Sequence, residues 1–192
     1  PHHRRRFVLK TFMIIMIVLA VGIVGLVAYA ATRPDTFRIE RATLINAPAQ
    51  SVYAILTDLR RGREWSPFER KDPNLKRTFT GPETGVGSAL EWEGDMNVGA
   101  GKLTIAQATP SKILLNLDMR KPMEGRNIIE YALANKGDAT QLTWSMHGKM
   151  NLIGRIMCIF INMEKDLGGE FERGLRDLKA LVERQAAATT TV

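Results

Sequence analysis

The chain has 192 residues, of which 45% are hydrophobic and 24% charged, and this length favours one domain that buries a core without metal or disulfides. The lone cysteine, Cys158, excludes an internal disulfide. The net charge of +7 is partly local, because four of the basic residues, Arg4, Arg5, Arg6 and Lys10, precede an apolar run. Beyond that run, basic residues exceed acidic ones by only three. So small an excess argues against a nucleic-acid partner.

The apolar run predicts a transmembrane helix over residues 11–31. Residues 12–31 carry no charge, and at 1.5 Å per residue they span about 30 Å, the thickness of a bilayer core. The basic residues 1–10 predict a cytoplasmic N-terminus, which places the rest on the periplasmic side of a bacterial inner membrane. Ala28-Tyr29-Ala30 also fits a cleavable signal, and this alternative stays open.

The stretch after the apolar run predicts a linker and then a folded domain. Residues 32–36 form the linker, and the domain is expected over residues 37–184. Pro48 follows Asn46 in a pattern typical of a helix start. Three elements are predicted there: a strand over 37–45, an amphipathic helix over 48–58 and a short helical turn over 59–68.

A run of strands separated by turn residues is predicted in the middle of the chain. Ile113, Leu115, Leu117 and Met119 alternate with polar positions, which is the period of a half-buried strand. Asn135–Asp138 predicts a hairpin turn. The strands are expected over residues 75–80, 88–95, 102–109, 112–121, 126–134 and 140–150.

A long amphipathic helix is predicted as the last element, before a tail over residues 185–192. Gly168, Gly169 and Gly174 each disfavour a helix by about 1 kcal/mol relative to alanine, so we expect them where the sheet approaches closely. The apolar face of the helix comprises Met163, Leu167, Phe171, Leu175, Leu178 and Val182. The order of elements predicts an α+β fold, with a curved antiparallel sheet of about seven strands around this helix.

Residues 152–161 are apolar except for Gly154 and Arg155 and are too few to span a bilayer. One interpretation is that they dip into the membrane interface while Arg155 meets lipid headgroups. The other is that they pack under the edge of the sheet.

Several stretches together resemble the SRPBCC superfamily of START-like and polyketide cyclase/dehydrase-like helix-grip proteins. They are Ile45-Asn46-Ala47-Pro48, Leu56-Thr57-Asp58, Glu64-Trp65-Ser66-Pro67-Phe68, residues 99–105 and residues 168–175. The resemblance covers about residues 37–184. It implies a hydrophobic cavity between sheet and helix for lipids, polyketides or other apolar molecules, in a family with both enzymes and binding proteins.

We expect the cavity to be lined by apolar side chains of the strands and the long helix. The predicted lining residues are Leu115, Leu117, Met119, Ile129, Leu142, Trp144, Met146, Leu167 and Phe171. No catalytic residue, metal ligand or cofactor site is predicted: His147 is expected to face outward, and Glu91, Glu93 and Asp95 to be a solvated strand face.

The first functional hypothesis is therefore a non-catalytic, membrane-anchored domain that binds a lipid or other apolar molecule at the membrane surface. The alternative is an accessory subunit of a larger integral-membrane complex, docked on its extracytoplasmic face. A third, a cyclase or dehydrase, rests on the resemblance alone and requires a convergent acid–base pair in the cavity.

Overall fold

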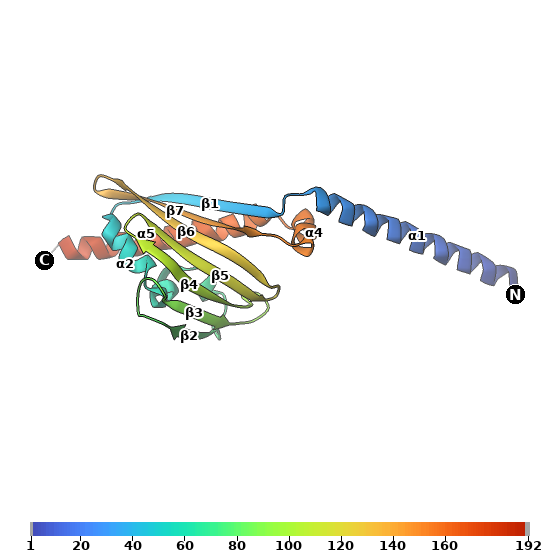
Figure 1. Cartoon of the computed structure of the whole chain (residues 1–192), viewed down its shortest axis with the longest axis horizontal. Helices are drawn as coiled ribbons and strands as arrows, with labels where there is room; N and C mark the ends of the chain where they lie inside the picture. The colour runs from blue at the N-terminus through green and yellow to red at the C-terminus, as the bar shows by residue number, and fades with distance from the viewer. Residues whose placement is uncertain (1, 191–192) are drawn as a thin grey trace. The chain divides into compact units, whose positions relative to one another are not determined.

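The computed structural model describes the backbone of residues 2–190 and the side chains of residues 9–188, and the chain forms two compact units (Figure 1). The smaller unit combines the N-terminal segment up to Asp35 with Met150–Asn162. The larger combines Thr36–Lys149 with the segment that begins at Met163. The side chains of Arg4, Arg5 and Arg6, used above to predict topology, lie outside the described residues.

Two helices make up the smaller unit. Helix α1 spans His2–Thr32. Its segment Leu9–Thr32 is the one helical stretch among the described residues that is long and apolar enough to cross a membrane. Membrane anchors and signal sequences share this property. Helix α4 (Leu152–Phe160) packs against α1.

The larger unit contains one antiparallel sheet of seven strands in the order β1-β7-β6-β5-β4-β3-β2. Strands β2 to β7 follow one another as neighbours, and β1 closes the sheet beside β7 along its whole length, from Thr36 opposite Lys149 to Ile45 opposite Thr140. This confirms the predicted fold class. The strands are β1 (Thr36–Ile45), β2 (Lys76–Thr80), β3 (Ala89–Glu93), β4 (Ala100–Thr109), β5 (Lys112–Lys121), β6 (Gly125–Lys136) and β7 (Ala139–Lys149).

The turn between β6 and β7 shows how the sequence sets the strand register. Only Gly137 and Asp138 separate the two strands, and Gly137 has a φ of +72°. Glycine adopts this left-handed conformation without the steric cost that a Cβ imposes. The hairpin turn predicted at Asn135–Asp138 is confirmed.

Helix α5 (Met163–Thr190) lies against β1 and carries the predicted apolar stripe. Phe171, Leu178 and Val182 are at most 1% exposed and form part of the hydrophobic core. The helix continues past Gln185, where the sequence suggested only a tail. Ala186 is half-buried against the core, which gives this last part a packing contact that the periodic pattern did not include. Residues 191 and 192 lie outside the described residues.

Short helices between β1 and β2 cover the rest of the core. They are α2 (Ala49–Leu56), η1 (Leu59–Arg61), α3 (Gly62–Trp65) and η2 (Phe68–Arg70). The buried Thr140 hydroxyl donates a hydrogen bond of 2.8 Å to the Ala47 carbonyl and thereby joins the start of β7 to the segment before α2.

Candidate functional site: a cavity between the sheet and the long helix

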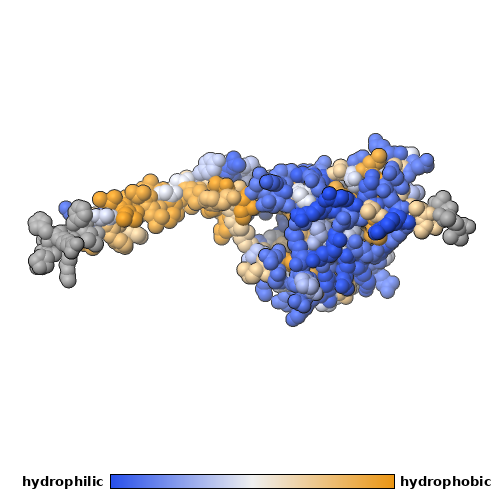
Figure 2. All heavy atoms as spheres, turned by 180° about the vertical axis from the view of Figure 1, so that it is seen from behind, coloured by the Kyte–Doolittle hydropathy of each residue, from blue (hydrophilic) through white to orange (hydrophobic). Residues whose placement is uncertain are grey.

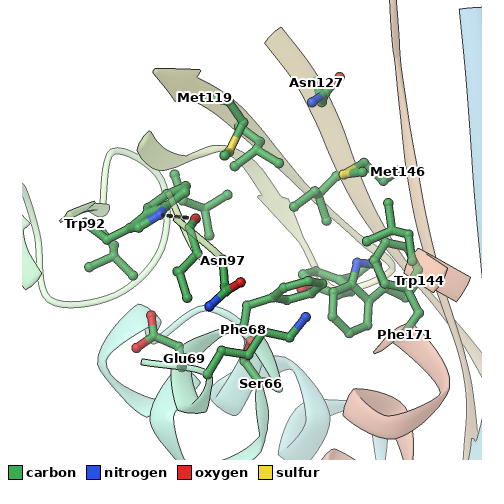
Figure 3. A pocket seen from close by; sticks show the side chains of 18 of the residues that line it. Ser66, Phe68, Glu69, Trp92, Asn97, Met119, Asn127, Trp144, Met146 and Phe171 are labelled. Carbon is green, nitrogen blue, oxygen red and sulfur yellow. Dashed lines mark hydrogen bonds between the residues drawn. The ribbon is translucent and has the colours of Figure 1, made fainter. Parts of the chain in front are cut away.

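A cavity of about 390 Å³ lies within the larger unit, in the range of small-molecule sites. Figure 3 shows Met119 and Met146 on the sheet side of this cavity, and Phe68 and Ser66 on the side of the short helices. The lining residues are Ser66, Phe68, Glu69, Lys71, Leu90, Trp92, Asn97, Val98, Leu103, Leu117, Met119, Pro122, Asn127, Ile129, Tyr131, Trp144, Met146, Leu167 and Phe171.

The width of the sheet explains why a cavity forms. Seven strands spaced by about 4.8 Å make a sheet roughly 30 Å wide, whereas a helix with its side chains is only about 10–12 Å across. Helix α5 packs on β1, which is one edge of the sheet. The inward face of β3 to β6 therefore extends beyond the helix, and side chains from those strands line the open space.

The structure places most of the predicted lining residues around this cavity. They are Leu117, Met119, Ile129, Trp144, Met146, Leu167 and Phe171. Leu115 and Leu142 are not among the lining residues, and both are buried in the hydrophobic core. That the seven bind a ligand stays a prediction.

A cluster of aromatic rings builds the wall next to α5. Trp144 stacks on Phe171 with ring centroids 4.2 Å apart and an interplanar angle of 9°. Trp65 meets Trp144 edge-on at 5.5 Å, and Phe68 meets it edge-on at 6.3 Å. Because each ring packs on the next, the ring contacts support this wall without any ligand.

Glycines in α5 allow the helix to approach this wall. A Cβ on Gly174 would lie 2.7 Å from Trp144 Cζ3 and 3.0 Å from Pro67 Cδ. A Cβ on Gly168 would lie 2.2 Å from the Arg41 guanidinium nitrogen Nη2. The expected close approach is therefore found at Gly168 and Gly174, but Gly169 has no heavy atom within 4 Å of its Cβ position.

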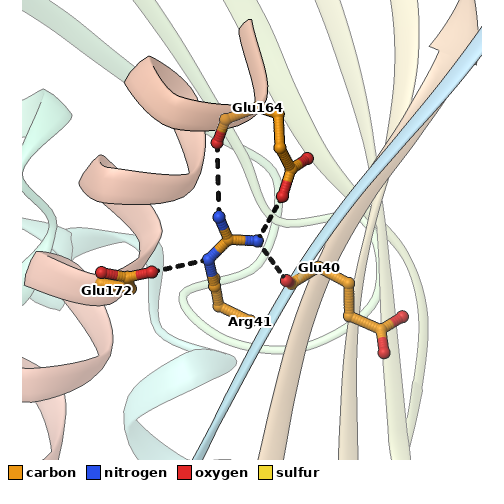
Figure 4. Close-up of polar contacts among 4 residues, drawn as sticks. All are labelled: Glu40, Arg41, Glu164 and Glu172. Carbon is orange, nitrogen blue, oxygen red and sulfur yellow. Dashed lines mark hydrogen bonds and ion pairs between the residues drawn. The ribbon is translucent and has the colours of Figure 1, made fainter.

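Arg41 on β1 fixes the first turns of α5 on the sheet (Figure 4). Its Nη1 donates to the Glu164 carboxylate at 2.7 Å, and its Nε donates to the Glu172 carboxylate at 2.7 Å. These hydrogen bonds, the one to Glu164 first, raise the pKa of Arg41 above its ordinary value. The guanidinium thus holds the end of the helix that supplies Leu167 and Phe171 to the cavity.

The charged groups of the lining already have partners. Glu69 accepts a hydrogen bond from Arg77 Nε at 2.5 Å, and Lys71 pairs with Glu170 at 2.8 Å. Burial raises the pKa of the Tyr131 phenol well above its ordinary value. At neutral pH the phenol is therefore uncharged, so it can donate a hydrogen bond but is a poor candidate for a base.

The predicted lining set left out residues that lie outside regular strands and two residues of β3. Asn97 and Val98 lie between β3 and β4, where no periodic pattern exists, although the Val98 carbonyl accepts a 3.4 Å hydrogen bond from Trp92 Nε1. Leu90 and Trp92 alternate with charged residues on β3, and this signal places both on the inward face. Phe68 carried no pattern beyond its family stretch.

Other sequence candidates lie away from the cavity. Among the methionines, Met96 is 87% exposed, and only Met119 and Met146 are in the lining. His147 is half-buried and lies outside the lining. Glu91 pairs with Lys102 and Arg120, and Glu93 with Lys121. Within residues 9–188, no cluster of His, Cys, Asp and Glu is suited to hold a metal ion.

Comparison with known proteins places this architecture in a family. The family model for polyketide cyclase/dehydrase and lipid transport proteins matches residues 36–183, whereas a comparison with curated proteins gave no match.

Three solved structures illustrate the shared fold. Protein CV1439 from Chromobacterium violaceum is 19% identical, with a TM-score of 0.52, over 79% of this chain and 99% of that chain. The ZhuI aromatase/cyclase from Streptomyces sp. R1128 is 15% identical, with a TM-score of 0.55, over 78% and 95%. Norcoclaurine synthase from Thalictrum flavum is 13% identical, with a TM-score of 0.58, over 78% and 96%. At these identities the likeness shows the fold alone, and it is the family match over most of the chain that assigns it: the chain belongs to the polyketide cyclase/dehydrase and lipid transport family of the SRPBCC superfamily.

Proposed function

We propose that the larger unit binds one apolar small molecule or lipid in its cavity, without covalent chemistry, while α1 tethers it to a membrane. The observation that carries the proposal is the lining itself. The cavity has the volume of a small-molecule site and is walled mainly by aromatic, leucine, isoleucine and methionine side chains. Flexible thioethers such as Met119 and Met146 suit apolar ligands of varied shape.

The pairing of the charged lining residues favours binding over acid–base catalysis. A cyclase or dehydrase needs an acid and a base that converge on the substrate at suitable pKa values. Glu69 and Lys71 are each neutralised by a neighbouring charge of opposite sign, and Tyr131 is held uncharged by burial. These groups can orient a polar end of a ligand, for which Asn97 and Asn127 also offer amides.

Native mass spectrometry of the full-length protein, gently extracted from its own membrane, tests the binding proposal. We expect a monomer with a small mass adduct that is lost on harsher activation. Leu117→Glu and Met146→Glu should abolish the adduct, because each buries an unpaired charge in the apolar wall. The matched control is Met96→Glu, which changes an exposed methionine outside the lining and should keep the adduct.

Two outcomes would overturn the binding proposal. One is a folded Leu117→Glu protein that still carries the adduct. The other is a larger assembly with stoichiometric protein partners and no adduct, which would support the accessory-subunit hypothesis instead.

The proposed tether places α1 across the membrane with the larger unit on the periplasmic side. The length and apolar composition of Leu9–Thr32 support the crossing, and the basic residues before it support the orientation. The intact mass of the protein in membranes should equal that of a chain that still includes α1. A mass equal to that of a chain cleaved after Ala30 would identify a signal sequence instead. Alkaline phosphatase fused after the last residue should be active, and bright green fluorescent protein at the same position would contradict the orientation.

A further inference from the structure

Helix α4 presents an apolar face that no described residue of its own unit covers. Ile153, Met157 and Phe160 follow one another at helical spacing, and they are 60%, 39% and 73% exposed. Ile161, just after the last turn, is 46% exposed. The helix has no buried residue. Its apolar side chains therefore do not form part of a protein core.

The opposite side of α4 is held on the end of α1. Arg155 Nη1 donates to the main-chain carbonyls of Ala31 at 3.2 Å and Arg33 at 3.3 Å. The last carbonyls of a helix lack partners within it, so the guanidinium satisfies groups that would otherwise be open. Ala30, two residues before the end of α1, is fully buried. That Arg155 meets lipid headgroups stays a prediction, and the structure adds that its Nη1 contacts the end of α1.

The geometry of α4 suits a helix that lies along a surface. Asn151 caps its N-terminus by accepting a 2.8 Å hydrogen bond from the Gly154 amide. Its nine residues span about 13 Å, less than half of a bilayer core. No residue from Leu152 to Phe160 is acidic, and the only basic one is Arg155, which is turned away from the apolar face.

We propose that α4 is a second membrane contact: an interfacial helix that inserts its Ile153, Met157 and Phe160 face among the lipids where α1 leaves the bilayer. The inference rests on the proposed function, because it requires α1 to span the membrane. Figure 2 shows that the apolar surface of α1 continues onto α4. The apolar face of α4 continues the surface of α1 and is fixed at the end of α1. If α1 spans the bilayer, this face lies at the depth where amphipathic helices bury their apolar side chains.

Site-directed fluorescence on the full-length protein in vesicles of phosphatidylcholine and phosphatidylglycerol tests this placement. In a Cys158→Ser background, single cysteines introduced as Phe160→Cys, Val18→Cys and Met96→Cys would carry a nitrobenzoxadiazole label. Val18 lies in α1 and Met96 in an exposed loop of the larger unit, so they serve as lipid and water references. Doxyl-labelled lipids and aqueous iodide are the two quenchers.

We expect the label at position 160 to show blue-shifted emission, quenching by shallow doxyl lipids and loss of access to iodide, whereas position 96 stays open to iodide. If the label at position 160 behaves like the label at position 96, while the label at position 18 lies in lipid, the inference is overturned and the anchor stands. Aqueous behaviour at both 18 and 160 would instead overturn the anchor. Protection at 160 in native membranes but not in lipid vesicles would show a protein partner on this face and would also refute the proposal.

Discussion

Two glycines of α5 should respond to the same substitution with opposite signs. Replacing glycine by alanine in a helix interior stabilises by about 0.5–1 kcal/mol when space allows. Gly169 has that space, since no heavy atom lies within 4 Å of its Cβ position. At Gly174 a new methyl group would lie 2.7 Å from Trp144 Cζ3, against an ordinary contact distance of 3.4–4 Å.

The clash at position 174 is not easily relieved. Trp144 would have to move by about 0.7 Å to restore a 3.4 Å contact, but it is stacked on Phe171 and wedged against Trp65. Overpacking of this kind costs about 1–3 kcal/mol. The helix-propensity gain is common to both sites, so Gly174→Ala should be about 1–3 kcal/mol less stable than Gly169→Ala.

Thermal unfolding of the two full-length variants in detergent, followed by circular dichroism, measures this difference. For a protein of this size each kcal/mol corresponds to roughly 2–4 °C in Tm. We expect Gly169→Ala to unfold above the wild type and Gly174→Ala below Gly169→Ala. Equal stabilisation by both substitutions would refute the close packing of α5 on Trp144.

Two further predictions concern single buried groups. Thr140→Val removes the hydroxyl that donates to the Ala47 carbonyl and should lower the free energy of unfolding in urea by about 1–3 kcal/mol. Thr143 is half-buried on the same strand, and Thr143→Val should change this free energy little. Equal losses in the two variants would contradict the role of that bond. Tyr131 has a raised pKa in the folded protein, so only the unfolded chain loses the phenolic proton above its ordinary value of 10.0. The stability that this phenol contributes should therefore be fully present below pH 10 and be lost above it. There the free energy of unfolding of the wild type should fall by up to about 1.4 kcal/mol per pH unit more than that of Tyr131→Phe. Parallel pH curves from urea unfolding would contradict the burial of this phenol.

The sequence predicted the sheet and the long helix because both are written as local periodicities. Alternation on β5 places Leu115, Leu117 and Met119 on one face, and the structure confirms that these three share the inward side. Alternation does not say how far along the strand the cavity begins. Leu115 is 1% exposed and lies outside the lining, opposite Ile105 and Ile129 in the neighbouring strands, whereas Leu117 lines the cavity two residues further on.

Long-range contacts were the part that the sequence could not supply. Arg155 is the one charge in an apolar segment, and its partners are carbonyls of Ala31 and Arg33, which precede it by more than 120 residues. Arg41 meets Glu164 and Glu172 across a similar separation. No periodic pattern links such residues, so only the fold reveals that one charge fixes α4 on α1 and the other fixes α5 on β1.

The same contacts explain how an open cavity can persist in a stable domain. An apolar void costs free energy, because its walls lose the dispersion contacts that a filled core would give them. Here the walls are supported from behind: Trp144 by Phe171 and Trp65, and the start of α5 by Arg41. When a wall is held in place before a ligand binds, little binding energy is lost to reorganisation, and a ligand that restores the missing contacts gains more of their free energy as affinity.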